Sequence, residues 1–208
     1  MSISKEKYRT VLKKYLPEEY TEVVVDLLTK HPVQFKISKP RKTKLGDFRA
    51  QPFGKHQISI NNNLNPYSFL ITTIHEFAHL VTYEKYKWNV KPHGKEWQNI
   101  YSKMIYPLIE QGNLPEDISN VLLNSLINVK ASSCSDLKLQ RVLMSYDKLE
   151  NGFVLLEKLD KNSTFALNGK EFSKGILRRT RYMCMENKTQ KVYLVNALAK
   201  VKEIKDER

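Results

Sequence analysis

Apolar residues recur three and four positions apart through most of the first 130 residues, the spacing typical of amphipathic helices. Pro17 separates the first two such stretches. Pro66 stands near the start of the third, where the first turn of a helix tolerates proline. The pattern predicts helices over residues 3–15, 18–30, 69–86, 92–110 and 115–129.

Strand signals follow a different distribution along the chain. Three short stretches between the second and third predicted helices have strand character, over residues 33–37, 45–50 and 57–61. Residues 137–147 fit no single period. Beyond them the chain is rich in strand signals, over residues 163–167, 170–172, 177–185 and 191–198.

Two hairpins are expected in this last region, at Asn168-Gly169 and at Asn187 to Gln190, because such residues favour tight turns. The polar break at 131–136 marks the expected domain boundary. The sequence thus predicts an α+β fold. Residues 1–130 form a domain of helices with a small antiparallel sheet, and residues 131–208 form a small β-rich region.

Charge adds a candidate partner to this picture. The formal net charge is +13, and it is concentrated in two regions. Residues 31–60 hold seven Lys and Arg against one Asp, and residues 151–208 hold thirteen against seven acidic residues. Two basic regions favour contact with a nucleic acid, although a solvated basic surface without a ligand has the same composition. The candidate contacts are Arg41, Lys42, Arg178, Arg179 and Arg181.

Cellular location is inferred from what the chain contains. The first residues have no apolar core of a signal peptide, and no apolar run approaches the roughly 20 residues of a membrane span. Cys134 and Cys184 are far apart in the sequence and show no spacing typical of a disulfide framework, which fits a reducing compartment. We therefore expect a cytoplasmic protein that does not contact a membrane.

The clearest chemical signal is His75-Glu76-Phe77-Ala78-His79. Two histidines four apart on a helix leave the same face and can reach one metal ion. Glu76 lies on the neighbouring face, where it can take a proton from a water at that metal, as in His-Glu-x-x-His peptidases. The alternative is an amphipathic helix with two incidental histidines. The apolar stripe beside them favours a buried site, through Leu70, Ile71, Ile74, Phe77, Ala78 and Val81.

A third ligand is expected downstream, because three protein ligands and one open position make the catalytic zinc pattern. His93 is the first candidate, since it precedes an amphipathic stretch whose apolar side includes Trp97. Glu96 is the alternative, close to the spacing at which some zinc peptidases place a glutamate. Imidazole is the commoner zinc ligand, which favours His93. Another peptidase pattern, with glycine at 82 and histidine at 85, fails at Thr82 and Lys85.

These motifs resemble the SprT family, which includes the Spartan-type metalloproteases. The resemblance rests on His75 to Leu80 and on Pro92-His93-Gly94-Lys95-Glu96-Trp97, together with a basic hairpin that ends at residues 58–61. It covers about residues 30–110. It implies a compact zincin-like fold, one Zn²⁺ held by His75, His79 and His93, and Glu76 as general base. It also implies a role near DNA, which in the Spartan branch is proteolysis of proteins crosslinked to DNA.

The chain departs from the family at its C-terminal region. Many members carry a zinc ribbon with paired Cys-x-x-Cys motifs, which two isolated cysteines cannot supply. We therefore expect a degenerate, ribbon-like β region without metal. The resulting hypothesis is a zinc metalloprotease that hydrolyses proteins associated with DNA. The alternative is a non-catalytic nucleic-acid-binding protein with a structural zinc site.

Overall fold

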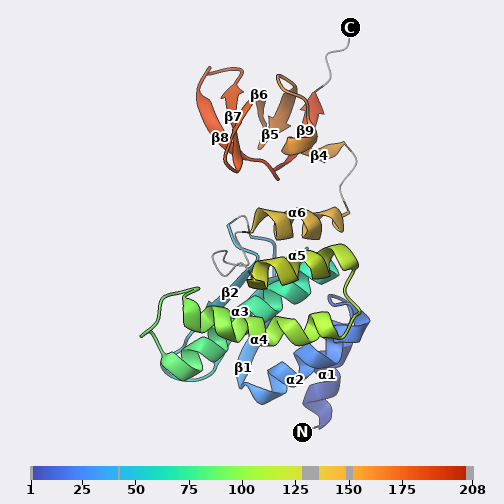
Figure 1. Cartoon of the computed structure of the whole chain (residues 1–208), viewed down its shortest axis with the longest axis vertical. Helices are drawn as coiled ribbons and strands as arrows, with labels where there is room; N and C mark the ends of the chain where they lie inside the picture. The colour runs from blue at the N-terminus through green and yellow to red at the C-terminus, as the bar shows by residue number, and fades with distance from the viewer. Residues whose placement is uncertain (1, 42, 128–135, 149–151, 205–208) are drawn as a thin grey trace. The chain divides into compact units, whose positions relative to one another are not determined.

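A computed structural model describes residues 2–41, 43–127, 136–148 and 152–204 of the chain. The chain divides into two compact units, Met1–Asp147 and Lys148–Arg208 (Figure 1). The first unit mixes helices with a small sheet, and the second contains six of the nine strands found in the described residues. The mixed α+β class predicted from the sequence is therefore correct.

The described part of the first unit begins with two α-helices joined by a short 3-10 helix, continues through a three-stranded sheet and ends with four more α-helices. Its helices are α1 (Ser2–Leu12), η1 (Glu18–Tyr20), α2 (Thr21–Lys30), α3 (Pro66–Tyr86), α4 (Lys95–Glu110), α5 (Glu116–Ile127) and α6 (Leu137–Ser145). Its strands are β1 (Val33–Ser38), β2 (Gly46–Arg49) and β3 (His56–Asn61).

The sheet of the first unit is mixed, not antiparallel as expected. β3 lies at its centre, antiparallel to β2 and parallel to β1. The β2–β3 pairing is a local hairpin, which a sequence pattern can indicate. The β1–β3 pairing joins strands that are not neighbours in the chain, so no turn signal records its direction. β2 is consequently an edge strand of this sheet.

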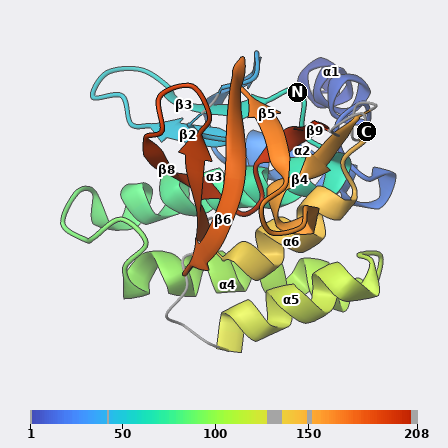
Figure 2. The ribbon, with the colours of Figure 1, turned by 90° about the horizontal axis from the view of Figure 1, so that it is seen from above.

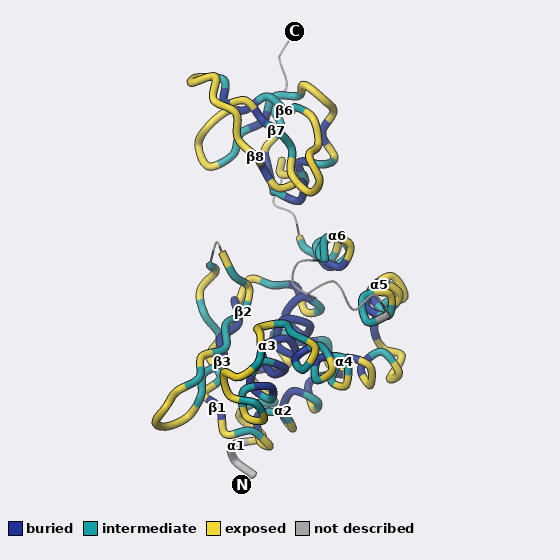
Figure 3. Tube along the Cα trace, turned by 60° about the vertical axis from the view of Figure 1, so that its left-hand side comes forward, coloured by how far each residue is buried: buried dark blue, intermediate teal, exposed yellow. Residues whose placement is uncertain are grey.

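Helix α3 lies at the centre of the first unit. Pro66 occupies its first turn, and the Asn65 side chain caps it by accepting a hydrogen bond from the Ser68 amide at 2.9 Å. Most of its residues from Ser68 to Thr82 are buried (Figure 3), as expected of a helix that is apolar on nearly all sides. Any polar side chain at its middle is therefore removed from bulk water.

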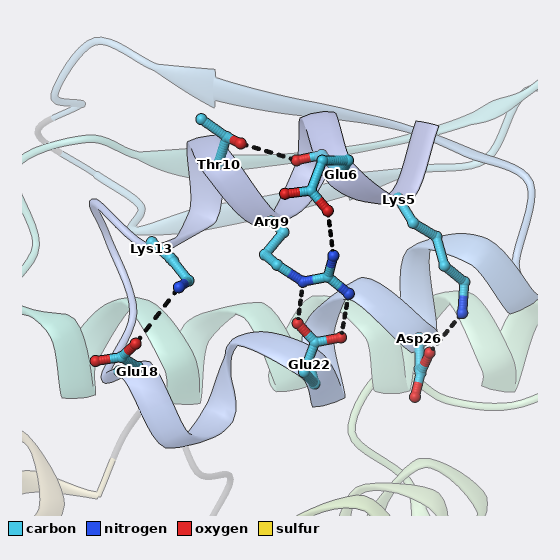
Figure 4. Close-up of polar contacts among 8 residues, drawn as sticks. All are labelled: Lys5, Glu6, Arg9, Thr10, Lys13, Glu18, Glu22 and Asp26. Carbon is cyan, nitrogen blue, oxygen red and sulfur yellow. Dashed lines mark hydrogen bonds and ion pairs between the residues drawn. The ribbon is translucent and has the colours of Figure 1, made fainter. Parts of the chain in front are cut away.

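Charged side chains join α1 to α2 on the surface of the unit (Figure 4). Arg9 contacts both Glu6 and Glu22, and Lys5 lies 3.0 Å from Asp26. These groups are solvent-exposed in large part, so water and salt screen the pairs and they contribute little to stability. The apolar faces of the two helices hold them in the fold, through residues such as Leu12 and Val24.

The boundary between the two units falls between residues 147 and 148, later in the chain than the expected boundary after residue 130. Helix α6 belongs to the first unit, because Leu139 and Leu143 are buried in its core. The Asn65 side chain also donates to the Leu143 carbonyl at 2.8 Å, so the cap of α3 holds α6 as well. Most of the polar break that suggested the boundary, residues 131–135, lies outside the described residues.

The second unit is a six-stranded sheet in the order β4-β9-β5-β6-β7-β8 (Figure 2). Its neighbouring strands are antiparallel throughout, three pairs as hairpins of consecutive strands and two through the pairing of β9 with β4 and β5. Its elements are β4 (Phe153–Leu155), η2 (Leu156–Lys158), β5 (Thr164–Leu167), β6 (Lys170–Arg178), β7 (Arg181–Glu186), β8 (Val192–Asn196) and β9 (Lys200–Ile204).

Turns of the second unit agree with the sequence at one place and differ at another. Asn168 and Gly169 both have positive φ, the backbone that a two-residue hairpin requires, and they join β5 to β6. The expected strand over 177–185 is wrong. A second turn at Arg179-Thr180 divides it, with Arg178 opposite Arg181. Arg179 takes a φ of 56° there, which side chains other than glycine or asparagine seldom adopt.

The second unit has its own small core. Cys184 is buried within it and free, whereas Cys134 lies outside the described residues. The other buried apolar members are Leu156, Leu159, Phe165, Phe172, Val195 and Val201. In the part of the chain that the structure describes, no helix combines the length and the apolar character that a membrane crossing requires.

Candidate metal centre

Three histidines meet beside the middle of α3. His75 and His79 lie one helical turn apart, and His93 reaches them from the loop before α4. The Nε2 atoms of His75 and His79 are 3.1 Å apart, those of His79 and His93 3.0 Å, and those of His93 and His75 3.1 Å. The three ring nitrogens therefore form a nearly equilateral triangle.

This triangle fits a tetrahedral zinc ion. Zinc–nitrogen bonds of about 2.0–2.1 Å at tetrahedral angles place ligand nitrogens roughly 3.3–3.4 Å apart. Three imidazole nitrogens that share one point have lone pairs facing one another, which is unfavourable unless a cation lies between them. Within the described residues, this is the group of histidine, cysteine and carboxylate side chains that could hold a metal.

Burial keeps these histidines in the neutral form that binds metal. Burial, together with the neighbouring His79 and His93, lowers the pKa of His75 to about 2. Burial and then His93 lower the pKa of His79 to about 4. Burial also lowers the pKa of His93. Protons thus compete weakly with a metal for these nitrogens at neutral pH.

Glu76 lies between α3 and the edge strand β2. Its side chain is buried, and burial followed by the nearby Asp47 carboxylate raises its pKa to about 8. The backbone amide of Phe48 donates a hydrogen bond to it. The carboxylate is therefore held beside the histidines by β2 and is absent from the group of three metal-binding side chains.

Gly46 in β2 leaves the space that the Glu76 carboxylate occupies, and sequence reasoning missed this role. A Cβ atom at Gly46 would lie 2.5 Å from Oε1 of Glu76 and 2.7 Å from Cγ2 of Thr72. Any larger side chain would displace the carboxylate or the strand. A glycine inside a strand pattern is the signal that could have found it, because such glycines often mark a close approach of other groups.

His93 is placed by its backbone and not by a helix. The expected helix over 92–110 begins only at Lys95, with Gly94 as its N-cap. His93 has a φ of 59°, a strained backbone for a residue with a side chain, and its carbonyl accepts from the Gln98 side chain at 2.9 Å. Glu96, the alternative third ligand, lies in the first turn of α4 and outside the metal-binding group.

Trp97 closes the site on its buried side. Its ring centroid lies 4.7 Å from that of His75, 5.2 Å from His79 and 4.7 Å from His93. Tyr101 stacks on Trp97 at 4.9 Å, and its ring centroid lies 6.1 Å from that of His75. Both rings are buried, so they fix the imidazoles and exclude water from behind them.

Known proteins are similar to this chain over the region that holds the three histidines. A family model described as the SprT-like family matches residues 13–119. The chain belongs to the SprT-like family. Protein SprT of Vibrio parahaemolyticus is 39% identical over 88 residues, which make up 38% of this chain and 53% of that protein. The chain thus spans about half the length of this relative. No solved structure matches.

The first basic region of this SprT-like chain is used partly inside the fold. The guanidinium of Arg41 donates to Asn61 Oδ1 at 2.8 Å and to Ser59 Oγ at 3.0 Å. It also contacts the carbonyls of Leu45 and Ser59, so it ties the connection before β2 to β3. These bonds occupy Arg41, which had been expected to contact nucleic acid. Lys42 lies outside the described residues.

The second basic region of the SprT-like chain lies on the surface. Arg178, Arg179 and Arg181 are all exposed, at the turn between β6 and β7. The next residue, Tyr182, packs against the core of the second unit, where the Lys174 ammonium lies 4.1 Å from its ring centroid. Tyr182 is therefore used inside the fold, whereas the three arginines face solvent.

Proposed function

We propose that this SprT-like protein is a zinc-dependent peptidase of the zincin type whose centre is His75, His79 and His93. The observation that carries the proposal is the convergence of three Nε2 atoms within 3.1 Å beside a buried carboxylate. The family is shared with Protein SprT, but the activity is our inference from the site. Three nitrogen donors leave a fourth position for water or substrate, as catalytic zinc sites do.

Zinc, when bound, supplies Lewis acidity that makes water a nucleophile near neutral pH and polarises a peptide carbonyl. The chain's residues supply the rest. The three imidazoles hold the ion, and Trp97 excludes water behind them. Glu76 accepts the proton of the attacking water and passes it to the leaving amine. The Phe48 amide and the space at Gly46 hold its carboxylate in place for both steps.

The raised pKa of Glu76 is compatible with this role. A carboxyl whose pKa lies near neutrality both accepts and donates protons efficiently. Its value of about 8 reflects burial and Asp47, and a nearby dication lowers it because the cation stabilises the carboxylate. A purely structural zinc site, the alternative function, has no use for such a buried acid beside three ligands.

A Glu76→Gln variant tests the proposal. The amide keeps the size of the side chain but cannot take the proton, so we expect casein or histone cleavage to fall by about a hundredfold or more. Zinc content should stay at about one per chain, because Glu76 is not a ligand. Cleavage at the wild-type rate by this variant would remove Glu76 from the chemistry.

We also propose that the turn at Arg178–Arg181 contacts a nucleic acid, which would place the peptidase near proteins bound to DNA. Arg178 lies directly opposite Arg181, and like charges at paired positions destabilise a hairpin unless an anion lies between them. All three arginines are exposed to solvent. Phosphate groups satisfy such a cluster.

Salt dependence tests this contact. Charge reversal of Arg178 and Arg179 to Glu should weaken DNA binding and flatten its log–log salt slope by about 0.7–0.9 for each lost contact. The matched control reverses Lys158 and Lys161, two exposed lysines of the same unit outside this turn. Equal effects of the two double variants would mean that the overall charge, not this turn, attracts the nucleic acid.

A further inference from the structure

Four aromatic rings lie together at the end of α3 next to the metal centre. Around Tyr83, the ring centroids of Trp88, His56 and Phe48 lie at 4.9, 5.2 and 5.9 Å. They come from α3, the α3–α4 loop, β3 and β2, and are called the Tyr83 cluster below. Segments distant in the chain have therefore brought their aromatic residues to one place.

The Tyr83 cluster continues directly from the centre. Tyr83 follows His79 by four residues, so it lies on the same face of α3 about 6 Å further along the helix. Phe48 is also the residue whose backbone amide donates a hydrogen bond to Glu76. An extended peptide advances about 3.3 Å per residue, so a substrate lying across the centre would bring a side chain to the cluster within two residues of the cleaved bond.

The cluster is open to solvent on one side. Trp88 is 72% exposed, whereas Trp97 beside the histidines is 1% exposed. Phe53, in the loop between β2 and β3, is 94% exposed. That loop is held in place by His56, whose Nδ1 accepts from the Gln51 amide at 3.0 Å. Figure 2 shows this loop and the α3–α4 loop projecting from the same side of the first unit.

Exposed rings of this size do little for the fold, because they remove little apolar surface from water. Large apolar side chains left on a surface beside a reactive centre mark a place where another molecule is bound. The positive charge around these rings restricts which side chains of the other molecule can bind there. The Lys87 ammonium lies 5.0 Å from the Tyr83 ring centroid, and Lys55 is exposed in the β2–β3 loop. Basic side chains would be repelled there.

We propose that the Tyr83 cluster is a specificity subsite that binds an aromatic or large aliphatic side chain of the peptide held at the metal centre. Trp88 and Tyr83 contact that side chain, within two residues of the cleaved bond. The inference rests on the proposed peptidase function and adds the class of substrate sequence that the site selects.

Cleavage-site mapping is the first part of the test. Casein and histone are digested by the wild-type protein, and the cut sites are read by mass spectrometry. We expect Phe, Tyr, Trp or Leu to be enriched within two residues of the cut. Trp88→Ala should lower kcat/KM for a peptide with Phe at the enriched position by at least about tenfold, mainly through KM. The same peptide with Ala there should be cut equally by both proteins.

Tyr106→Ala is the matched control, since Tyr106 is 49% exposed on α4 and is not one of the four rings. It should cut both peptides like the wild type, and zinc content should be the same in all variants. Active wild-type protein without the enrichment, or Trp88→Ala with an unchanged preference, would overturn the subsite and leave the proposed peptidase function standing.

A binding measurement separates the two failures. The chain has two tryptophans and Trp97 is buried, so acrylamide quenches mainly Trp88. In zinc-loaded Glu76→Gln protein, the Phe peptide should protect this fluorescence from quenching at concentrations where the Ala peptide does not. If the wild type cleaves nothing and this protection occurs, the Tyr83 cluster does bind the aromatic side chain and the proposed peptidase function is wrong. Without protection the subsite is overturned.

Discussion

Both units of this protein bury polar side chains, but they treat them differently. In the second unit, the buried Lys174 donates to the carbonyls of Leu159 and Glu157 and lies over the Tyr182 ring. The buried Glu186 pairs with Lys170 at 3.0 Å and accepts from Thr189 at 2.6 Å. Each of these two buried charged groups therefore has partners within the fold.

In the first unit, the Nε2 atoms of His75, His79 and His93 converge on one another. Burial makes charged histidines unfavourable, and the neutral rings turn lone pairs toward a shared point. The comparison distinguishes two uses of buried polarity. A cluster whose groups satisfy one another stabilises a fold, whereas a cluster that needs an added cation indicates a binding site.

The largest expected effect is the loss of zinc in His93→Ala. Two histidines on one helix turn leave the ion with an incomplete set of ligands, so zinc content should fall from about one per chain to a small fraction of that. Elemental analysis after dialysis measures it. Glu96→Ala is the control and should retain zinc. The reverse pattern would make Glu96 the third ligand.

Gly46→Ala should have the next largest effect. The atoms nearest to a Cβ atom there belong to Glu76 and Thr72, so it would crowd the carboxylate first, and hydrolysis should fall about tenfold or more while zinc is retained. Gly175→Ala is a matched control in the second unit, where a Cβ atom would lie 2.2 Å from the Met183 carbonyl. It should affect stability and spare hydrolysis. If both variants lost activity equally, position 46 would have no special link to Glu76.

Much of the centre could be predicted because its signals are local. The spacing of His75 and His79, the proline at the start of α3 and the hairpin at Asn168-Gly169 each involve residues within a few positions of one another. The three histidines do lie together in the structure, and the family was recognised from these residues.

The rest depends on contacts between distant segments. Whether β1 runs parallel to β3, and whether Gly46 lies against Glu76, is decided by packing across the unit. Helix α6 was ambiguous because few of its nine residues are apolar and buried, and its identity comes from Leu139 and Leu143 packing into the core. The turn at Arg179 contains no glycine or asparagine from which it could have been predicted.

The third prediction concerns acid stability of the metal-free protein. The pKa of His75 is lowered from 6.5 to about 2 in the folded state, so the unfolded chain binds the proton first as pH falls. Stability is therefore lost as pH falls below about 6.5, by about 2 kcal/mol from His75 between pH 6.5 and 5. Chemical denaturation of chelator-treated protein measures it. His75→Gln should show a shallower pH dependence, and an identical one would contradict the assignment.

The smallest effect should come from Lys174→Met in the second unit. Methionine fills similar space but leaves the carbonyls of Leu159 and Glu157 without their side-chain donor, a loss that apolar packing offsets in part. We expect the free energy of unfolding of the second unit to fall by about 1 kcal/mol, equivalent to about fivefold faster hydrogen exchange in β6 and β7.

Lys188→Met, at an exposed turn lysine, is the control and should leave exchange unchanged. Zinc content should not change in either variant, because both lie outside the unit that holds the histidines. Slower exchange in Lys174→Met would show that the buried ammonium destabilises the unit, and the contrast between a self-satisfied cluster and a cation-seeking one would fail.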